Sequence, residues 1–243
     1  MAGKREATSS EILVVQNAES EGPGLLARAL EDQRLGTRIV RAFRGEPVPR
    51  SVEDRPGVII LGGPMGVYET GRFPHLADEI ALAADAVARG RPFLGVCLGS
   101  QILAAAAGSR VYRGPVEEIG WFPVTLSALG RRDPVLGVLH EDPVVFHWHG
   151  DTFDLPEGAA LLASSRLYAH QAFRLGPRAY GVQFHPEITP AMVDEWVSLA
   201  GDGYAAFGGA SGAARIRSEA RRHAPPLAGC VAAMAAALFR ADA

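Results

Sequence analysis

Cysteines and long apolar runs are both scarce in this sequence. Only two of the 243 residues are cysteines, Cys97 and Cys230. Two cysteines are too few for the disulfide framework of a secreted protein, so we expect a reducing, cytoplasmic environment. No stretch approaches the roughly 20 apolar residues of a membrane span, and residues 1–10 lack the apolar core of a signal peptide. We therefore expect no membrane partner.

An excess of charge of one sign is also absent. The 24 basic and 27 acidic residues give a formal net charge of -3 and are interspersed along the chain. Binding to nucleic acid through its phosphates requires a basic face. The densest basic stretch, residues 215–222, is better explained as a solvated helix face. We expect no nucleic-acid partner.

The composition favours one globular unit. A hydrophobic content of 48% over 243 residues is enough for a sizeable core, and α/β folds of this length often form a single domain. We expect a flexible N-terminus over residues 1–10 and an α/β domain over residues 11–200. Residues 201–243 are expected to form a C-terminal helical extension of the same domain.

Strands and helices alternate in the first half of the chain. Apolar runs predict strands, and apolar residues at helical spacing predict the helices between them. The strands are expected at Ile12–Val15, Arg38–Ala42, Val58–Leu61 and Phe93–Val96, and the helices at Gly24–Leu35, Leu76–Ala88 and Gly99–Ala107. Such alternation predicts a doubly wound, mainly parallel sheet with helices on both faces.

The second half of the chain is rich in predicted strands before helices return. The strands are expected at Trp121–Leu126, Val144–His147, Leu161–Ser164, His170–Leu175 and Tyr180–Phe184. Helices are expected at Pro190–Leu199, Ala213–Arg222 and Leu227–Phe239, the last two separated by Pro225-Pro226. Residues 201–212, rich in Gly and Ala, could form a mobile link.

A cysteine lies where a predicted buried strand turns into a helix. The segment Gly95-Val96-Cys97-Leu98-Gly99 has the pattern of a nucleophile elbow. Its glycines permit a tight turn, and the start of a helix favours the thiolate over the thiol. Cys230 has no such setting and is expected to be an inert core thiol. We therefore predict that Cys97 is a nucleophile that attacks a carbonyl carbon.

A histidine and a glutamate two residues apart follow the last predicted strand. Side chains at positions i and i+2 can lie on the same side of an extended chain. Glu187 could then accept a hydrogen bond from one ring nitrogen of His185, so that the other nitrogen faces Cys97. The pair predicts a base and the residue that orients it.

The turn Gly62-Gly63-Pro64 supplies flexible backbone after another strand. Acyl transfer requires N–H groups directed at the developing oxyanion. The amide of Leu98, next to the nucleophile, is one natural donor, and that of Gly63 can be the other.

The three motifs, in this chain order, resemble those of the class I, or triad, glutamine amidotransferase family. They are Gly62-Gly63-Pro64, Gly95-Val96-Cys97-Leu98-Gly99-Ser100-Gln101 and Gln183-Phe184-His185-Pro186-Glu187. The resemblance also takes in residues 118–121 and 147–151, and is strongest to small stand-alone members similar to the amidotransferase domain of GMP synthase. It implies a flavodoxin-like fold and a γ-glutamyl thioester on the cysteine, with no cofactor.

The resemblance also implies a glutamine pocket. Gln101 matches a substrate-contacting position, and backbone near Gly120 and Trp121 is expected to line the same pocket. His149 and Asp151 are expected to shape it. Because no synthetase domain follows, ammonia would pass to a separate synthetase or acceptor. The alternative is a stand-alone γ-glutamyl peptidase or hydrolase acting on γ-glutamyl amides or peptides.

Three other interpretations of the sequence remain open. An α/β-hydrolase could have a cysteine in its elbow, but that fold places the acid before the histidine. A metal site is suggested by His147, His149 and Asp151, although Thr152 follows where a metallo-β-lactamase-like motif has histidine; we expect no metal. A non-catalytic binding module would not need the intact triad.

Overall fold

The computed structural model describes residues 11–139, 143–201 and 208–240. The predicted flexible N-terminus and residues 202–207 of the predicted link at 201–212 lie outside these residues. Within the described chain, no helix is long and apolar enough to cross a membrane.

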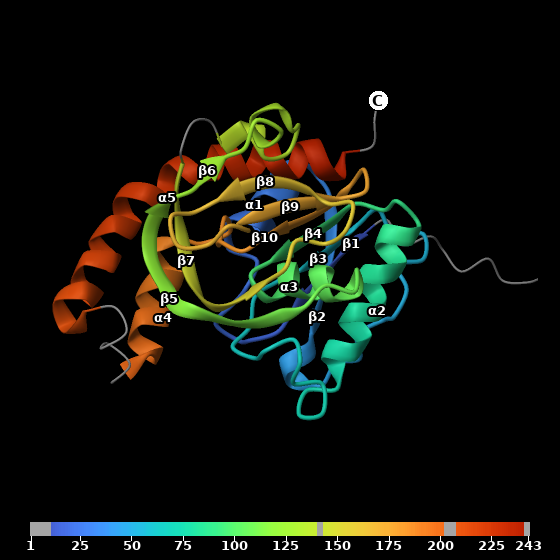
Figure 1. Cartoon of the computed structure of the whole chain (residues 1–243), viewed down its shortest axis with the longest axis horizontal. Coiled ribbons are helices and arrows are strands. Elements are labelled where there is room, and N and C mark those ends of the chain that lie inside the picture. Colours follow the sequence, from blue (N-terminus) through green and yellow to red (C-terminus); the bar gives the residue numbers. More distant parts are fainter. Residues whose placement is uncertain (1–10, 140–142, 202–207, 241–243) are drawn as a thin grey trace, which may run out of the picture.

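An eight-stranded sheet forms the centre of the molecule (Figure 1). Its order is β2-β1-β3-β4-β10-β9-β8-β6. Neighbouring strands from β2 to β10 are parallel, and the pairs beyond β10 are antiparallel. The strands are β1 (Glu11–Gln16), β2 (Gly36–Arg41), β3 (Val58–Ile60), β4 (Phe93–Val96), β6 (Thr125–Leu126), β8 (Ala160–Ser164), β9 (Ala172–Leu175) and β10 (Ala179–Val182). The parallel part has the flavodoxin-like 2-1-3-4-5 order, which confirms the predicted fold class.

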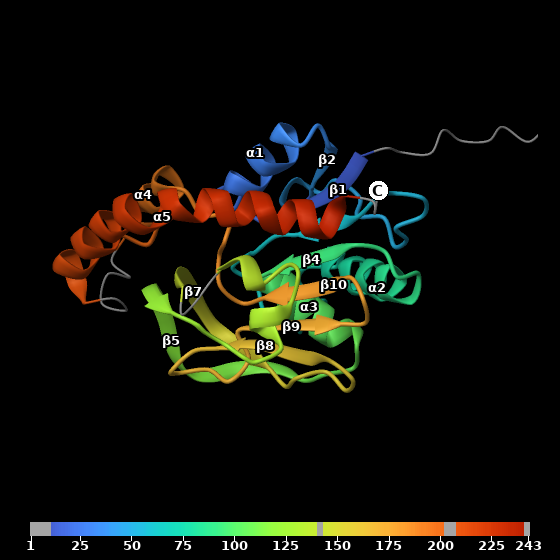
Figure 2. The same cartoon turned by 90° about the horizontal axis from the view of Figure 1, so that it is seen from above.

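Helices cover both faces of the sheet because its buried strands are apolar on both sides. On β1, Ile12 and Val14 pack into a core with α1 and α5, whereas Leu13 and Val15 pack into a core with α2 and α3. Figure 2 shows these two helix layers on opposite sides of the sheet. The helices are α1 (Gly24–Asp32), α2 (His75–Ala88), α3 (Leu98–Ala106), α4 (Pro190–Leu199) and α5 (Gly209–Phe239), with short 3-10 turns η1 (Ala42–Arg44), η2 (Gly130–Arg132) and η3 (Gly137–Leu139).

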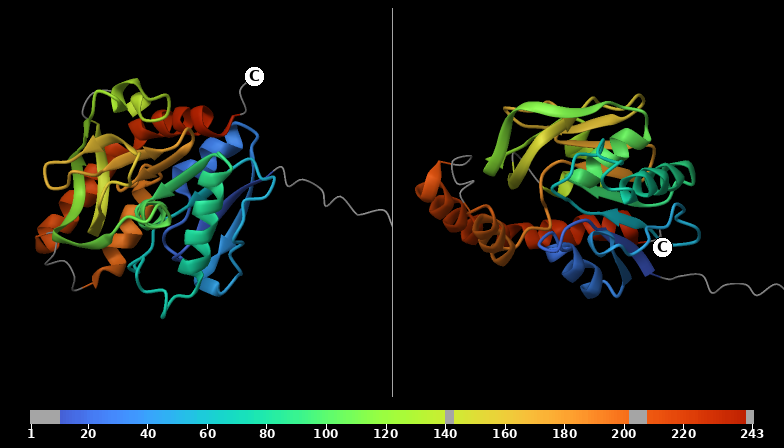
Figure 3. Two further views of the ribbon diagram at one scale, coloured as in Figure 1. Left: turned by 45° about the vertical axis from the view of Figure 1, so that its right-hand side comes forward. Right: turned by 90° about the horizontal axis from the view of Figure 1, so that it is seen from below.

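A separate antiparallel ribbon extends from the main sheet. It pairs β5 (Val111–Pro123) with β7 (Val144–Phe153), and its register shifts between Arg113 and Glu118. Figure 3 shows the ribbon, green and yellow, at the opposite side of the molecule from α1. Both strands are longer than predicted, because exposed residues in β5 and buried polar residues in β7, such as His147 and His149, break the apolar pattern by which a buried strand is recognised.

The C-terminal region forms one helix, whereas two were predicted. Helix α5 runs continuously through Pro225 and Pro226. Its buried residues recur every three or four positions on both sides of the prolines and form one apolar stripe over α1 and α4: Ala213, Ile216, Ala220, Ala224, Leu227, Val231, Met234 and Leu238. The prolines lie on the exposed face. Burial of the whole stripe outweighs the backbone hydrogen bonds that the prolines cannot form.

Candidate active site

Cys97 lies between β4 and α3 in a strained conformation. Its φ of 50° and ψ of -107° are rare for a residue with a side chain. The glycines on either side make the turn possible: a Cβ on Gly95 would overlap the backbone of Gly99, and a Cβ on Gly99 would overlap the carbonyl of Ile60. The sequence thus folds here into the predicted elbow, with a nearly buried thiol at the start of a helix.

His185 and Glu187 lie next to each other beyond the end of β10. That strand ends at Val182, two residues earlier than predicted, and His185 is instead held by its own N–H, which donates to the carbonyl of Phe146 at 2.8 Å. Nδ1 of His185 is 2.8 Å from Oε1 of Glu187, and both side chains are buried. The ring also packs edge-on against Trp196 at 4.9 Å. The ring orientation is therefore fixed from three sides.

The charges around His185 favour its protonated form. Burial alone would lower the pKa of the imidazole, but the carboxylate of Glu187 and the thiolate of Cys97 outweigh burial and raise the pKa well above its usual value. The other ring nitrogen, Nε2, makes no hydrogen bond of standard geometry within the described chain. The arrangement can hold an imidazolium beside a thiolate.

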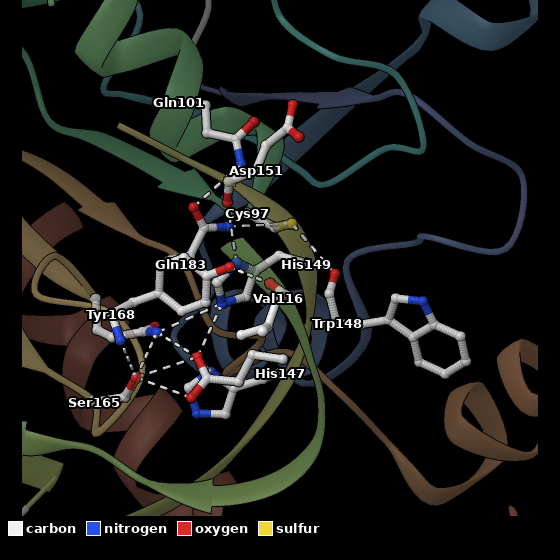
Figure 4. A network of polar contacts seen from close by, with 12 residues as sticks. Cys97, Gln101, Val116, His147, Trp148, His149, Asp151, Ser165, Tyr168 and Gln183 are labelled. Carbon is white, nitrogen blue, oxygen red and sulfur yellow. Dashed lines mark hydrogen bonds and ion pairs between the residues drawn. The ribbon is translucent and has the colours of Figure 1, made fainter. Parts of the chain in front are cut away.

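Two glutamines connect the thiol to the neighbouring backbone, as Figure 4 shows. Nε2 of Gln183 donates to Sγ of Cys97 at 3.5 Å, and Nε2 of Gln101 donates to Oε1 of Gln183 at 3.1 Å. Gln101 therefore reaches the nucleophile through Gln183 in this structure. Gln183 is part of the histidine motif, but the sequence alone did not indicate its role, since an amide beside a strand end is a common packing residue.

Cys97 lies between two chambers. The first, of about 410 Å³, has a charged rim and is lined by Gly63, Pro64, Met65, Gly66, Tyr68, Glu69, Cys97, Leu98, Gln101, Arg113, Glu117, Ile119, Trp148, His149, Gly150 and Asp151. The second, of about 260 Å³, is lined by Ser20, Glu21, Gly63, Pro64, Cys97, Trp148, His185, Trp196, Leu199 and Ala200. We refer to them as the first and second chambers.

Most of the residues predicted for the site meet at these chambers. Gly63 and Leu98 line the first chamber beside Cys97, with Leu98 at the first position of α3, where a backbone N–H has no helical partner. Gly120 and Trp121 do not line either chamber, although the preceding Ile119 does. Trp121 instead packs on Phe146 and on His223 of α5.

His149 belongs to a buried polar cluster behind the first chamber (Figure 4). Its Nε2 is 3.1 Å from Oε2 of Glu118, and its Nδ1 is 3.0 Å from the carbonyl of Asp151. Burial alone would raise the pKa of Glu118, but hydrogen bonds from His149 and Ser165 lower it below its usual value. The cluster therefore fixes the backbone at Asp151, on the chamber wall. The sequence resemblance included Glu118 but did not indicate this positioning role.

The same cluster contains the one grouping of possible metal ligands found among the described residues. Ligand atoms of Glu118, His147 and His149 lie within 4.8 Å of one another. Glu118 already accepts hydrogen bonds from Ser165 and Gln171 as well as His149. Burial lowers the pKa of His147 to about 4, so this ring is neutral at neutral pH. Glu118, His147 and His149 therefore fit a hydrogen-bonded cluster that supports the chamber wall. The expected absence of a metal stays a prediction.

Sequence comparisons identify related proteins. A family model described as glutamine amidotransferase class-I matches residues 15–196. The glutamine amidotransferase-like protein YfeJ of Salmonella typhimurium is 32% identical over 177 residues, which cover 72% of this chain and 74% of YfeJ. A separate GMP synthase subunit of Natronomonas pharaonis is 31% identical over 77% of this chain and 94% of that subunit. The match spans only about a third, 33%, of a full-length GMP synthase.

Solved structures agree with these relatives. The crystal structure of a glutamine amidotransferase from Thermotoga maritima has a TM-score of 0.86 and 31% identity, covering 95% of this chain and 98% of that one. A glutamine amidotransferase from Methylobacillus flagellatus has a TM-score of 0.87 and 29% identity, covering 96% and 97%. These matches extend well beyond residue 196, so the similarity includes the C-terminal helices.

Proposed function

Because the chain belongs to the class I glutamine amidotransferase family, we propose that it hydrolyses the γ-amide of glutamine through a thioester on Cys97 and passes the ammonia to a separate synthetase or acceptor. The observation that carries this proposal is the buried His185–Glu187 pair beside Cys97, at the junction of the two chambers. The family supports amide transfer in general. The triad and the separate acceptor are the parts that we propose.

The first half-reaction forms the thioester. The Cys97 thiolate attacks the γ-carbon of the substrate, and the amides of Gly63 and Leu98, two residues that line the first chamber with Cys97, stabilise the oxyanion. The protonated His185 then gives its Nε2 proton to the γ-nitrogen, the C–N bond breaks and ammonia leaves. The carboxylate of Glu187 keeps Nδ1–H of His185 oriented throughout.

The second half-reaction frees the cysteine. His185, now neutral, takes a proton from water, and the resulting hydroxide equivalent attacks the thioester carbon. The C–S bond breaks, glutamate is released, and the thiolate with its protonated partner is restored. No further group is required, because one proton cycles between His185 and the reacting water or nitrogen.

The rim of the first chamber supports an amino acid as the substrate. Arg113 carries positive charge there, and Glu69, Glu117 and Asp151 carry negative charge. An α-amino acid presents an ammonium and a carboxylate at one end, so a rim with both signs can bind it in one orientation. Its side-chain amide would then point to Cys97.

A separate acceptor is supported by the relatives. The Natronomonas protein is named as one subunit of GMP synthase, and this chain matches 94% of it. We take this match as support for delivery of ammonia to a separate protein.

The test is release of glutamate from glutamine by the purified chain, alone and with candidate synthetases. We expect slow turnover alone, stimulation by the partner, and loss of at least about a thousandfold in kcat/KM for Cys97→Ala. A fully active Cys97→Ala variant would contradict the mechanism. Turnover of γ-glutamyl peptides far above that of glutamine would replace the proposal with a γ-glutamyl hydrolase.

A further inference from the structure

The second chamber lies on the side from which the γ-nitrogen departs. It contains His185, whereas the first chamber does not. Since His185 delivers the proton to the leaving nitrogen, that nitrogen is released next to it. The walls of the second chamber are mainly apolar, from Trp148, Trp196 and Leu199. Glu21 is the one residue with an ionisable carboxyl group among those that line this chamber.

Glu21 approaches the reacting groups closely. A Cβ on Gly62 would overlap Oε2 of Glu21, and the same point is 3.1 Å from Cε1 of His185 and 3.5 Å from Cβ of Cys97. The residue is partly exposed, but its carboxyl lies deep enough that burial raises its pKa to about 7, with the nearby charge of His185 opposing that rise. Among the described residues, the charges of His185 and Glu187 act on this carboxyl, and no hydrogen bond does.

The loop that carries Glu21 is fixed at both ends. On one side, Nε1 of Trp196 donates to the carbonyl of Ser20 at 2.8 Å. On the other side, the N–H of Leu25 donates to the carbonyl of Glu187 at 2.8 Å. A Cβ on Gly24 would overlap that same carbonyl. The carboxyl of Glu21 is thus held beside the triad by the same segments that form the triad and the chamber wall.

We propose that Glu21 binds a cationic amine that enters the second chamber to attack the thioester. This inference rests on the proposed function, because it requires a thioester at Cys97. A carboxylate that accepts no hydrogen bond from the residues around it, beside mainly apolar walls, is a site for one positive charge.

The proton balance of the step is complete. An alkylammonium ion gives a proton to the carboxylate of Glu21, which releases it to solvent when the product leaves, and the neutral amine attacks the thioester. The new C–N bond forms, the C–S bond breaks, and the amine's other proton passes to His185.

The volume of the second chamber also allows amines larger than ammonia. About 260 Å³ is many times the roughly 30 Å³ that a molecule of water occupies in the liquid, and ammonia is of similar size. A small alkylammonium ion can therefore place its charge at Glu21 and its carbon chain against Trp196 and Leu199.

The test compares two acceptors that attack the same thioester. With glutamine or the more reactive γ-glutamyl-p-nitroanilide as donor, γ-glutamyl transfer is measured to methylamine, a cation at neutral pH, and to hydroxylamine, which is neutral there. The ratio of kcat/KM for methylamine over hydroxylamine is expected to fall at least about tenfold in Glu21→Gln, the scale of one charge-assisted hydrogen bond. Both transfers use the same thioester. A smaller fraction of folded protein would therefore lower both rates equally and leave their ratio unchanged.

The matched control is Glu19→Gln on the same loop. Glu19 is exposed and pairs with Arg44 at 2.6 Å outside both chambers, so the ratio is expected to stay at its wild-type value. An unchanged ratio in Glu21→Gln, with normal hydroxamate formation, would overturn the role of Glu21 and leave the proposed function intact. Absence of any Cys97-dependent transfer from either donor would overturn the proposed function and this inference with it.

Discussion

A different local interaction holds each residue of the proposed triad, Cys97, His185 and Glu187. The cysteine is held by a turn that two flanking glycines make possible, and the histidine by a backbone hydrogen bond to β7. The glutamate is buried and is held by its contact with Nδ1 of the imidazole at 2.8 Å. A change at any one of them acts on the others through charge.

The charge of Glu187 can be tested separately from its hydrogen bond. Glu187→Gln retains an acceptor for Nδ1–H but removes the carboxylate that raises the pKa of His185. The active form carries a protonated His185, so activity is lost as pH rises through the pKa of this residue. A lowered pKa therefore moves the alkaline limb of the kcat/KM profile to lower pH, with a loss of about 10- to 100-fold near the optimum.

The control for this prediction is Glu195→Gln, an exposed carboxylate on α4. Its pH profile is expected to match that of the wild type. An alkaline limb that stays in place or moves to higher pH in Glu187→Gln would contradict the assigned role.

Glu79 predicts a pH dependence of stability. It is fully buried on α2, accepts a hydrogen bond from Asn17 at 3.1 Å, and has a pKa that burial raises from 4.5 to about 8. The folded state therefore binds more protons than the unfolded state between these two values. The contribution of Glu79 to the free energy of unfolding is greatest below pH 4.5. It falls as pH rises toward about 8, by at most about 1.4 kcal/mol per pH unit.

Urea unfolding at several pH values measures this effect. Glu79→Gln is isosteric and can still accept a hydrogen bond from Asn17, but it has no carboxyl group to titrate. Between pH 5 and 8, which lies between the two pKa values, we therefore expect the stability of this variant to fall less than that of the wild type. Equal slopes for the two proteins would show that Glu79 is not the responsible group.

At the residue level, the sequence predicted Cys97, His185 and Glu187 as nucleophile, base and orienting acid. The structure brings these residues together, and their catalytic roles stay a prediction. It did not predict Glu21 or Gln183. Glycine spacing and a His-x-Glu pair are local signals that are visible in the sequence. Glu21 reaches Gly62 only because β1 and β3 are adjacent in the sheet, and no local pattern indicates that proximity.

At the scale of elements, the turn from β4 into α3 controls the site. Gly99 packs directly against β3, and a Cβ there would overlap the carbonyl of Ile60. Backbone atoms cannot move aside as a flexible side chain can. The elbow therefore depends on a contact between α3 and a strand that is not its sequence neighbour.

Gly99→Ala is expected to lower the free energy of unfolding by about 1–3 kcal/mol, because relief of the overlap requires α3 to shift. Gly71→Ala is the matched control, since a Cβ there would meet nothing within 4 Å. Denaturant unfolding of the two variants distinguishes them. A Gly99→Ala protein as stable as Gly71→Ala would show that the close approach is absent.

The elements that the sequence predicted well are those with strong apolar patterns. Strand β4 and helix α4 have the predicted bounds. The prediction was wrong for α5 because Pro225 and Pro226 are local signals of a helix end, whereas the apolar stripe that keeps the helix continuous is recognised only over its whole length. Both strands of the ribbon were predicted too short, since exposed residues in β5 and polar residues in β7 interrupt the apolar pattern.

At the scale of the whole molecule, the parallel sheet brings distant segments together. Loops after β1, β3, β4 and β10 all leave the sheet at the same edge, which is where ligands bind in open α/β sheets. They supply Glu21, Gly63, Cys97 and His185 to the two chambers. The ribbon closes the first chamber with Trp148 and Asp151, and α4 closes the second with Trp196. In the proposed mechanism, the substrate binds in the first chamber and the nitrogen departs through the second, and Cys97 lines both.

The covalent intermediate is the central claim, and mass spectrometry of the acid-quenched protein tests it most directly. After incubation with glutamine or γ-glutamyl-p-nitroanilide, we expect one γ-glutamyl group on the peptide that contains Cys97, and none in Cys97→Ala. Turnover of either donor with no adduct at Cys97, or with an adduct at Cys230 instead, would contradict the account.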